Sequence, residues 1–312
     1  MSQATPFADR LAGAVRRCAN PLVVGLDPRV ANLPAGMLGA DESSSPHKVA
    51  AAFREFCNQV IDVVAPLVCA VKPQSAFFEE VGPPGMAALA EVITYARQHG
   101  LLVILDGKRN DIGSTAEAYA KAYLGIPPNS VWGADALTVS PYLGEDSLTP
   151  FVQIAQKNDA GIFVLVKTSN PGSGLFQDLI ADGQPVYEHV ADLVQRLAKQ
   201  TVGESGYGVV GAVVGATYPQ QLAKLRAAMT HSWLLVPGFG VQGGSARDVA
   251  GAFDANGLGA VISSSRAIIF AHQRPEFRDK YGDRRWQQAV EAATREAIEQ
   301  LRAETPAGKL RP

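Results

Sequence analysis

The sequence LLVILDGKRNDIGSTAEAYAKAY, residues Leu101–Tyr123, contains the pattern and the chemistry around which this chain is organised. It begins with the apolar run Leu101–Leu105, which is typical of a buried strand. Residues Ile112–Tyr123 have the pattern of a helix. Four charged residues separate the two: Asp106, Lys108, Arg109 and Asp111. Because the carboxyl ends of strands face the crevice in which α/β proteins bind ligands, this cluster predicts a reactive site.

The same succession of strand and helix recurs along the chain. Apolar runs predict further strands at Pro21–Leu26, Leu67–Val71, Ala136–Val139, Ile162–Val166, Val209–Val214, Trp233–Val236 and Ala260–Ile262. Polar residues follow nearly every strand: Asp27, Lys72, Asp106, Ser140, Lys167, Gln242 and Arg266. A doubly wound sheet requires neither the eighth strand nor these polar ends. We therefore predict an α/β fold, a (β/α)8 TIM barrel that forms a single domain over residues 1–312, with a loose tail at about residues 306–312.

The composition narrows the classes of partner and compartment. The net charge is −2 and there is no basic run, so we expect neither a nucleic-acid nor a membrane partner. No apolar stretch approaches the roughly 20 residues of a membrane span, and the N-terminus lacks the apolar core of a secretory signal. Cys18, Cys57 and Cys69 show no C-x-x-C spacing, which favours free thiols in a reducing cytoplasm over disulfides or a zinc site.

The charged residues around Asp106 have a spacing that suits proton transfer. Asp106 and Lys108 are two apart and share one side of an extended segment, and Lys72 ends the neighbouring strand. Asp111 and Thr115 are four apart, which predicts one face of the following helix. Alternating charges keep the lysines protonated without a metal, as a reaction that develops negative charge on carbon requires. The alternatives are a solvated ion-pair network, or Mg²⁺ on the two aspartates with Lys108 competing for them.

A glycine-rich segment after the seventh predicted strand suggests a phosphate site. Residues 238–243 match G-x-G-x-x-G, but the acidic residue that a dinucleotide fingerprint needs about 20 residues later is missing. In barrels of this type, the loops after strands seven and eight commonly bind phosphate. We therefore expect backbone N–H groups of Gly240–Gly244 and the cation in Ser263–Arg266 to hold a phosphate. The alternative is a plain tight turn beside a surface arginine.

These motifs resemble those of one family. Asp106–Thr115 is similar to the D-x-K-x-x-D-I-x-x-T signature of orotidine 5′-phosphate decarboxylases. Segments 71–79 (VKPQSAFFE), 168–173 (TSNPGS) and 237–244 (PGFGVQGG) resemble the longer, bacterial-type branch of that family. The resemblance implies a cytoplasmic homodimeric barrel that converts orotidine 5′-monophosphate to UMP and CO₂ in de novo pyrimidine biosynthesis, with no metal and no cofactor.

The resemblance also implies roles for individual residues. Lys108 is expected to protonate C6 of the pyrimidine, Asp106 to lie beside the substrate carboxylate, and Lys72 to hold Asp106 and reach the ribose. Asp111 is expected to act in the partner subunit's site, with Ile112 and Thr115 near it. The remaining substrate contacts are expected to be Asp27 on a ribose hydroxyl, Ser169 on the pyrimidine, and Pro237, Gln242, Gly243 and Arg266 around the phosphate.

Three other functions fit parts of the pattern. A Mg²⁺-dependent sugar-phosphate lyase on the same barrel shares a similar D-x-K-x-x-D element, but the segment around Lys72 and the Ser169 loop favour the decarboxylase. A non-catalytic nucleotide-binding barrel has no need of the proton donor Lys108. A Rossmann-type dehydrogenase is the third alternative, and binding of NAD(H) tests it.

Overall fold

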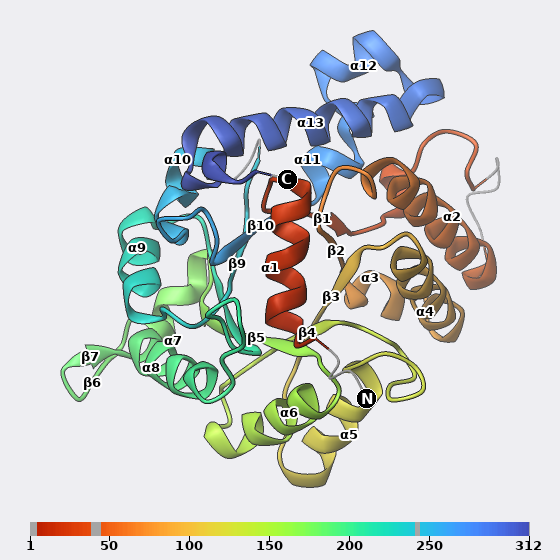
Figure 1. Cartoon of the computed structure of the whole chain (residues 1–312). Coiled ribbons are helices and arrows are strands. Elements are labelled where there is room, and N and C mark those ends of the chain that lie inside the picture. The colour runs from red at the N-terminus through yellow and green to blue at the C-terminus, as the bar shows by residue number, and fades with distance from the viewer. Residues whose placement is uncertain (1–4, 39–44, 241–243, 312) are drawn as a thin grey trace.

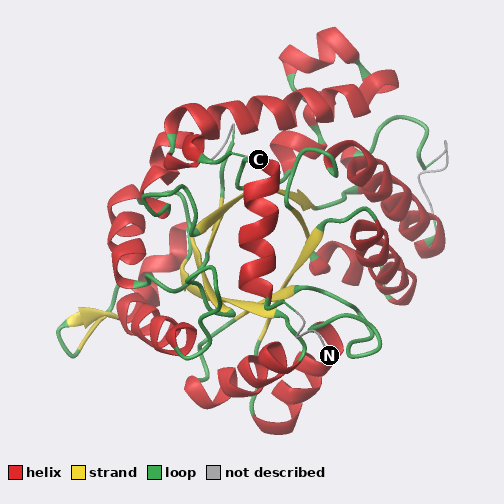
Figure 2. Ribbon diagram, viewed as in Figure 1, coloured by secondary structure: helices red, strands yellow, loops and turns green. Residues whose placement is uncertain are grey.

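A closed ring of parallel strands forms the centre of the molecule (Figure 2). This computed structural model describes residues 5–38, 45–240 and 244–311. Around the barrel the strands follow the order β1 (Leu22–Leu26), β10 (Ala260–Ser264), β9 (Leu234–Pro237), β8 (Val210–Val214), β5 (Gly161–Lys167), β4 (Ala136–Val139), β3 (Leu102–Arg109) and β2 (Ala70–Pro73). The predicted single-domain (β/α)8 barrel is confirmed, and closure of the ring excludes a doubly wound sheet.

The strands are buried because both of their faces are covered, by the barrel interior and by the outer helices. All residues of β1, β4, β8 and β10 are buried, which is why the sequence shows continuous apolar runs rather than alternation. The larger helices of the outer layer are α2 (Pro46–Val64), α4 (Pro83–Gln98), α5 (Gly113–Tyr123), α6 (Glu145–Lys157), α8 (Val186–Lys199), α9 (Pro219–Ala228) and α13 (Trp286–Glu304). In the described part of the chain, no helix combines the length and apolar character needed to cross a membrane.

Short elements fill the connections between strands and helices. The short α-helices are α3 (Ser75–Glu79), α7 (Gly174–Gln177), α10 (Ala246–Val249), α11 (Arg266–Ile269) and α12 (Pro275–Tyr281). The 3₁₀ turns are η1 (Val30–Asn32), η2 (Pro171–Ser173), η3 (Ala250–Ala252), η4 (Ala271–Gln273), η5 (Asp283–Arg285) and η6 (Pro306–Lys309). A small antiparallel hairpin, β6 (Ile180–Ala181) and β7 (Gln184–Pro185), projects from the barrel after α7 (Figure 1).

Helix α1 (Phe7–Cys18) closes the amino-terminal end of the barrel, across whose mouth it lies (Figure 1). Its Phe7 ring packs edge-on against Phe163 of β5, with the ring centroids 6.1 Å apart. Its Arg10 forms an ion pair of 2.6 Å with Asp135, the residue before β4. The amino-terminal end is therefore filled by packing, and the site is left to the carboxyl ends of the strands.

The prediction of a loose tail at about residues 306–312 is wrong for the described residues, which reach 311. Residues Pro306–Lys309 form η6, and Ala307 and Leu310 are buried. Lys309 Nζ also donates a hydrogen bond of 2.9 Å to the carbonyl of Ala255. Two apolar side chains with a surface to cover are enough to dock the segment, although its Pro and Gly content suggested a free end.

Candidate active site

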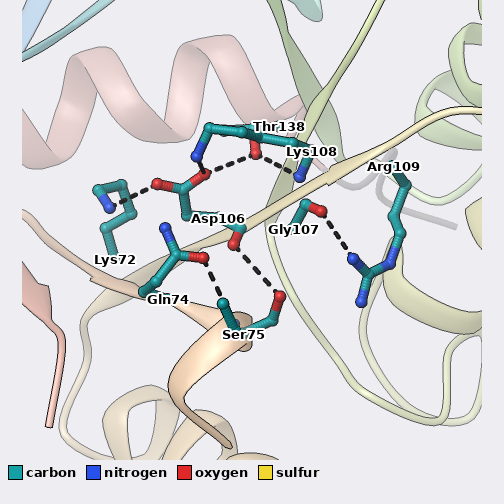
Figure 3. Close-up of polar contacts among 9 residues, drawn as sticks. Lys72, Gln74, Ser75, Asp106, Gly107, Lys108, Arg109 and Thr138 are labelled. Carbon is teal, nitrogen blue, oxygen red and sulfur yellow. Dashed lines mark hydrogen bonds and ion pairs between the residues drawn. The ribbon is translucent and has the colours of Figure 1, made fainter. Parts of the chain in front are cut away.

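Asp106 is the centre of a compact charged cluster at the carboxyl end of β3 (Figure 3). Its Oδ2 lies 2.8 Å from Nζ of Lys72, and its Oδ1 lies 2.5 Å from Nζ of Lys108. The hydroxyl of Thr138 on β4 donates a bond of 2.9 Å to the same Oδ1. Lys72 and Asp106 are buried, whereas 47% of the Lys108 side chain is exposed. The structure thus brings together the three residues that the spacing placed on neighbouring strands, and leaves Lys108 accessible.

A backbone irregularity sets the direction of Lys108. The register between β3 and β4 shifts between Leu105 and Arg109, and Lys108 has a φ of +44°. A non-glycine residue in this left-handed region costs about 1–3 kcal/mol and persists only where its surroundings hold it. Here the Lys108 N–H donates a bond of 2.9 Å to the Thr138 hydroxyl. Thr138 therefore fixes both the backbone of Lys108 and the carboxylate with which Lys108 pairs.

The cluster is held in its charged state. Burial alone would raise the pKa of Asp106, but the charges of Lys72 and Lys108 outweigh burial and hold this pKa well below its usual range. Burial alone would lower the pKa of Lys72, but Asp106 and Asp27 outweigh it, so this pKa is raised. Near neutral pH the site therefore presents a carboxylate and a fixed ammonium.

A cavity of about 720 Å³ opens above Lys72 and Asp106. Asp27 lines it, and the Asp27 Oδ1 is buried without a hydrogen-bond partner among the described residues. A buried acceptor of this kind is costly unless a ligand donates to it, and a sugar hydroxyl is a suitable donor. The other polar or charged side chains in the wall are Arg29, Asn32, Gln74, Ser263, Ser265, Arg266, Gln273 and Arg274. The cavity thus combines an anionic floor with cationic walls.

Two of the predicted phosphate residues line this cavity. Pro237 and Arg266 both line it, Pro237 at the end of β9 and Arg266 at the start of α11. Gly240 lies between them in sequence with a φ of +125°, which favours glycine, and its N–H donates a bond of 3.4 Å to the carbonyl of Gly244. The other two predicted contacts, Gln242 and Gly243, fall outside the described residues. The segment after β9 and the start of α11 therefore both border the cavity, as expected, and Arg266 supplies the positive charge there.

The predicted partner-facing residues lie away from the cavity. The prediction that Asp111 and Thr115 share a helix face is wrong, because α5 begins only at Gly113. Asp111 Oδ1 instead accepts the N–H of Ile112 at 2.8 Å, and Ile112 is extended. Ile112 is 56% exposed, and Thr115 is exposed as well. These residues form a surface beside the site rather than part of its wall.

Ser169, the predicted pyrimidine contact, lies in the exposed loop after β5. The loop is braced by Gln177, which accepts the N–H of Thr168 at 3.0 Å. Gly215 after β8 allows the loop to approach, since a Cβ there would lie 2.8 Å from the Cβ of Ser169. The position of Ser169 is therefore well supported by the barrel, although it does not line the cavity.

Thr138 contacts the charged cluster but was not predicted from the sequence. The only local signal is a hydroxyl within the short apolar run Ala136–Val139. Its two hydrogen bonds join residues about thirty positions away, and spacing cannot reveal such contacts. Ser75 was missed for the same reason; its Oγ donates at 3.4 Å to the carbonyl of Asp106.

A family profile, a similar sequence and similar structures all match this chain to orotidine 5′-phosphate decarboxylases. A family profile described as "Orotidine 5'-phosphate decarboxylase / HUMPS family" matches residues 20–278. Orotidine 5′-phosphate decarboxylase from Rhodopirellula baltica is 58% identical over 298 residues, which cover 95% of this chain and 99% of that protein. The structure of Leishmania donovani OMP decarboxylase has a TM-score of 0.73 and 34% identity over 96% of this chain and 98% of that one. The Leishmania donovani UMP synthase structure has a TM-score of 0.75 and 36% identity, and the match covers 96% of this chain and 57% of that longer one.

Proposed function

This chain belongs to the orotidine 5′-phosphate decarboxylase / HUMPS family, and we propose that it converts orotidine 5′-monophosphate to UMP and CO₂ in pyrimidine biosynthesis. The profile covers a family with more than one activity. The decarboxylase is favoured by the 58% identity to a protein of that name over nearly the full length of both chains. The observation that carries the mechanism is the Asp106 carboxylate, held between two lysines beside a cavity that Arg266 also lines.

We propose that the cavity orients the substrate by its two ends. Arg266 and the backbone of the loop after β9 would take the phosphate, as a charge-assisted fork and N–H groups can. Asp27 would accept a bond from a ribose hydroxyl through its unpartnered Oδ1. Ser169 would contact the pyrimidine from the loop after β5. The substrate carboxylate would then lie next to Asp106, and C6 next to Lys108.

In the chemical step, the bond between C6 and the carboxylate carbon breaks and CO₂ leaves. The electron pair stays on C6 as a carbanion, which the Lys108 ammonium stabilises and then protonates to give UMP. Solvent returns a proton to Lys108, whose side chain is half exposed. Lys72 stays protonated beside Asp106 because its pKa is raised, so it fixes the carboxylate without competing as the acid.

The phosphate end contributes although it does not react. Binding energy from this remote group can offset the cost of bringing the substrate carboxylate close to Asp106. Whether this repulsion itself speeds the reaction is contested in principle. Stabilisation of the developing carbanion by Lys108 is the larger effect in our proposal, because it acts only as charge develops.

We propose that the enzyme is a homodimer in which Asp111 acts in the partner subunit's site. Exposed apolar side chains occur in the connecting segments that follow β3, β4 and β5, at the same end as the cavity: Ile112, Tyr142, Leu143, Leu175, Phe176, Leu179 and Ile180. Exposed apolar groups on neighbouring loops mark an interaction surface, and a second copy would cover them.

Mixing Asp111→Ala with Lys108→Ala protomers should then restore part of the activity. Failure to recover activity after demonstrated subunit exchange would place Asp111 in its own chain's site.

We propose that the reaction needs neither metal nor organic cofactor and takes place in the cytoplasm. Both oxygens of Asp106 are engaged by lysine ammonium groups, so Mg²⁺ would have to displace Lys72 or Lys108 to bind there. Among the described residues, no three His, Cys, Asp or Glu side chains are grouped as a metal site requires. The cysteines are free thiols, as suits a reducing compartment.

The test is the loss of orotidine 5′-monophosphate absorbance on addition of purified protein, with and without EDTA. Rapid loss that is insensitive to EDTA, with UMP as the product, is the expected result. Activity that disappears with EDTA and returns with Mg²⁺ would favour a metal-dependent lyase instead. Binding of UMP by a folded dimer without turnover would favour a nucleotide-binding barrel.

A further inference from the structure

Arg109 lies next to Lys108 in sequence but points away from it, as Figure 3 shows. Its Nη1 donates a bond of 2.7 Å to the carbonyl of Gly107. Its Nη2 forms an ion pair with Glu79 of α3 and contacts the hydroxyl of Tyr123 of α5 at 3.4 Å. Only 19% of the Arg109 side chain is exposed, and it does not line the substrate cavity.

The carbonyl that Arg109 holds belongs to the peptide unit that precedes the Lys108 Cα. The N–H of the same unit donates to the Thr138 hydroxyl at 2.9 Å. The plane of this peptide is therefore fixed at both ends, by Arg109 on one side and by Thr138 on the other. The angle φ of Lys108 is the rotation about its N–Cα bond, which joins this peptide to the next one. Arg109 and Thr138 hold the first peptide, and the pairing of Arg109 with Val139 of β4 holds the chain after Lys108, so the left-handed φ of +44° is maintained.

We propose that Arg109 is a positioning residue for the proposed decarboxylation, which it serves by locking the Gly107–Lys108 peptide and so aiming the Lys108 ammonium. The inference rests on the proposed function. The anchors of Arg109 are independent of the substrate: Glu79 is on α3, and the rings of Tyr119 and Tyr123 on α5 lie 5.8 and 5.5 Å from its guanidinium carbon. A planar guanidinium is needed because one group must reach a carbonyl and a carboxylate at once, which a lysine ammonium on a flexible stem does poorly.

Without the guanidinium, the Gly107 carbonyl loses its partner and the peptide is free to rotate. Lys108 then relaxes toward an ordinary negative φ, which moves its ammonium away from C6. Asp27 and Arg266 have no contact with this peptide in the described structure, so substrate binding remains. A fall in kcat with little change in KM is the signature that separates positioning from general loss of structure.

The experiment compares Arg109→Met and Arg109→Lys with a matched control, Arg97→Met. Arg97 is also half-buried, with 20% of its side chain exposed, and its Nη1 binds the carbonyl of Gly133 at 3.1 Å and Asp135 at 3.0 Å. It lies at the amino-terminal end of the barrel, away from the cavity. For each protein we would measure kcat and KM for orotidine 5′-monophosphate, the Kd for UMP and the fraction folded.

For Arg109→Met we expect kcat to fall by about 10- to 100-fold, as small misplacements of a reacting group do, with KM and the UMP Kd within about threefold of wild type. Arg109→Lys should keep little of the wild-type kcat. A further variant, Arg109→Ala, should show a similar loss of kcat and should recover part of it when guanidinium is added at millimolar concentration. Arg97→Met should lose stability but keep its kcat per folded molecule. An unchanged kcat in Arg109→Met, or a loss no greater than the loss of folded protein, would overturn the inference.

A crystal structure of Arg109→Met provides a readout that does not depend on activity. We expect a negative φ at Lys108 and a longer distance between Lys108 Nζ and Asp106 Oδ1 than in the wild type. A retained φ of about +44° with an intact ion pair would overturn the positioning role even if the variant were inactive. Absence of turnover in the wild-type protein would instead count against the proposed function, and the crystallographic result would still decide the role of Arg109.

Discussion

Two buried aspartates at opposite ends of the barrel have nearly the same surroundings and opposite uses. Asp135, before β4 at the amino-terminal end, pairs with Arg10 at 2.6 Å and Arg97 at 3.0 Å. Asp106, at the carboxyl end of β3, pairs with Lys72 at 2.8 Å and Lys108 at 2.5 Å. Each carboxylate is thus held by two cations, although Lys108 is only two residues from Asp106. A buried, doubly paired aspartate is therefore no evidence of chemistry by itself.

The difference between the two sites lies in the cations and in the space around them. Arginine keeps its proton under all ordinary conditions, so the Asp135 site can only hold segments together. Lysine can release a proton, and Lys108 is half exposed at its site. Asp106 also lines the cavity, whereas Asp135 does not. Lysines in place of arginines, next to open space, distinguish the pair that we propose to be reactive from the structural one.

Among the substitutions that test this comparison, Lys108→Ala should have the largest effect on turnover. We expect turnover to fall by about 10³-fold or more, because both the proton donor and the charge that stabilises the carbanion are removed. Binding of UMP, measured by calorimetry, should change little. The counterpart Arg97→Ala at the Asp135 site should turn over normally per folded molecule. Substantial activity in Lys108→Ala would rule out Lys108 as the acid.

The next largest effect separates stability from activity. Asp135→Asn leaves two half-buried arginines without their carboxylate, and we expect the free energy of unfolding to fall by about 3 kcal/mol. Asp106→Asn leaves the buried Lys72 ammonium without its carboxylate, so we expect a comparable loss of stability, but it should also abolish most of the turnover. Urea unfolding and kinetic assays on both variants check this. The contrast fails if the folded Asp135→Asn protein also loses its activity.

A smaller effect is expected for Thr138→Val, which removes the hydroxyl that joins Asp106 and the Lys108 N–H. We expect kcat to fall by about tenfold, because the loss of a hydrogen bond to a charged group misplaces both partners. Thr138→Ser should retain most of the activity. The control is Thr294→Val in α13, where a buried hydroxyl donates at 2.7 Å to the carbonyl of Val290. Equal kcat values for the two valine variants would remove Thr138 from the mechanism.

The smallest expected effect is on the pH dependence of stability. The pKa of Asp106 is lowered from 3.8, so its contribution is complete above about pH 4 and is lost as the pH falls through its folded value. Between the folded and the unfolded pKa, the stabilisation from Asp106 falls by about 1.4 kcal/mol for each unit that the pH is lowered. The gap in unfolding free energy between wild type and Asp106→Asn should therefore narrow below pH 4. A gap that stays constant to pH 3 would show that this pKa is not lowered.

The ring of strands and the charged core of the site were predictable because both depend on short-range patterns. Continuous apolar runs such as Val209–Val214 identify strands buried on both faces. The two-residue spacing of Asp106 and Lys108, with Lys72 on the preceding strand, was enough to place three charges together. Within the charged cluster, the prediction that Asp111 lies on the face of a helix was wrong. The Ile112 N–H donates a hydrogen bond to the Asp111 carboxylate, and the helix begins only at Gly113.

The order of side chains along the chain is enough to predict the alternation of strands and helices and the cluster of charged residues. The proposed function also depends on contacts between separate elements: the hydrogen bond from Thr138 on β4 to Asp106 on β3, the position of α1 over the amino-terminal mouth, and the buried Asp27 Oδ1 at the cavity. The left-handed φ of Lys108 belongs to this second group. Local sequence disfavours it, and it persists because hydrogen bonds from neighbouring elements outweigh the strain. Such long-range contacts have no period that a single sequence can display.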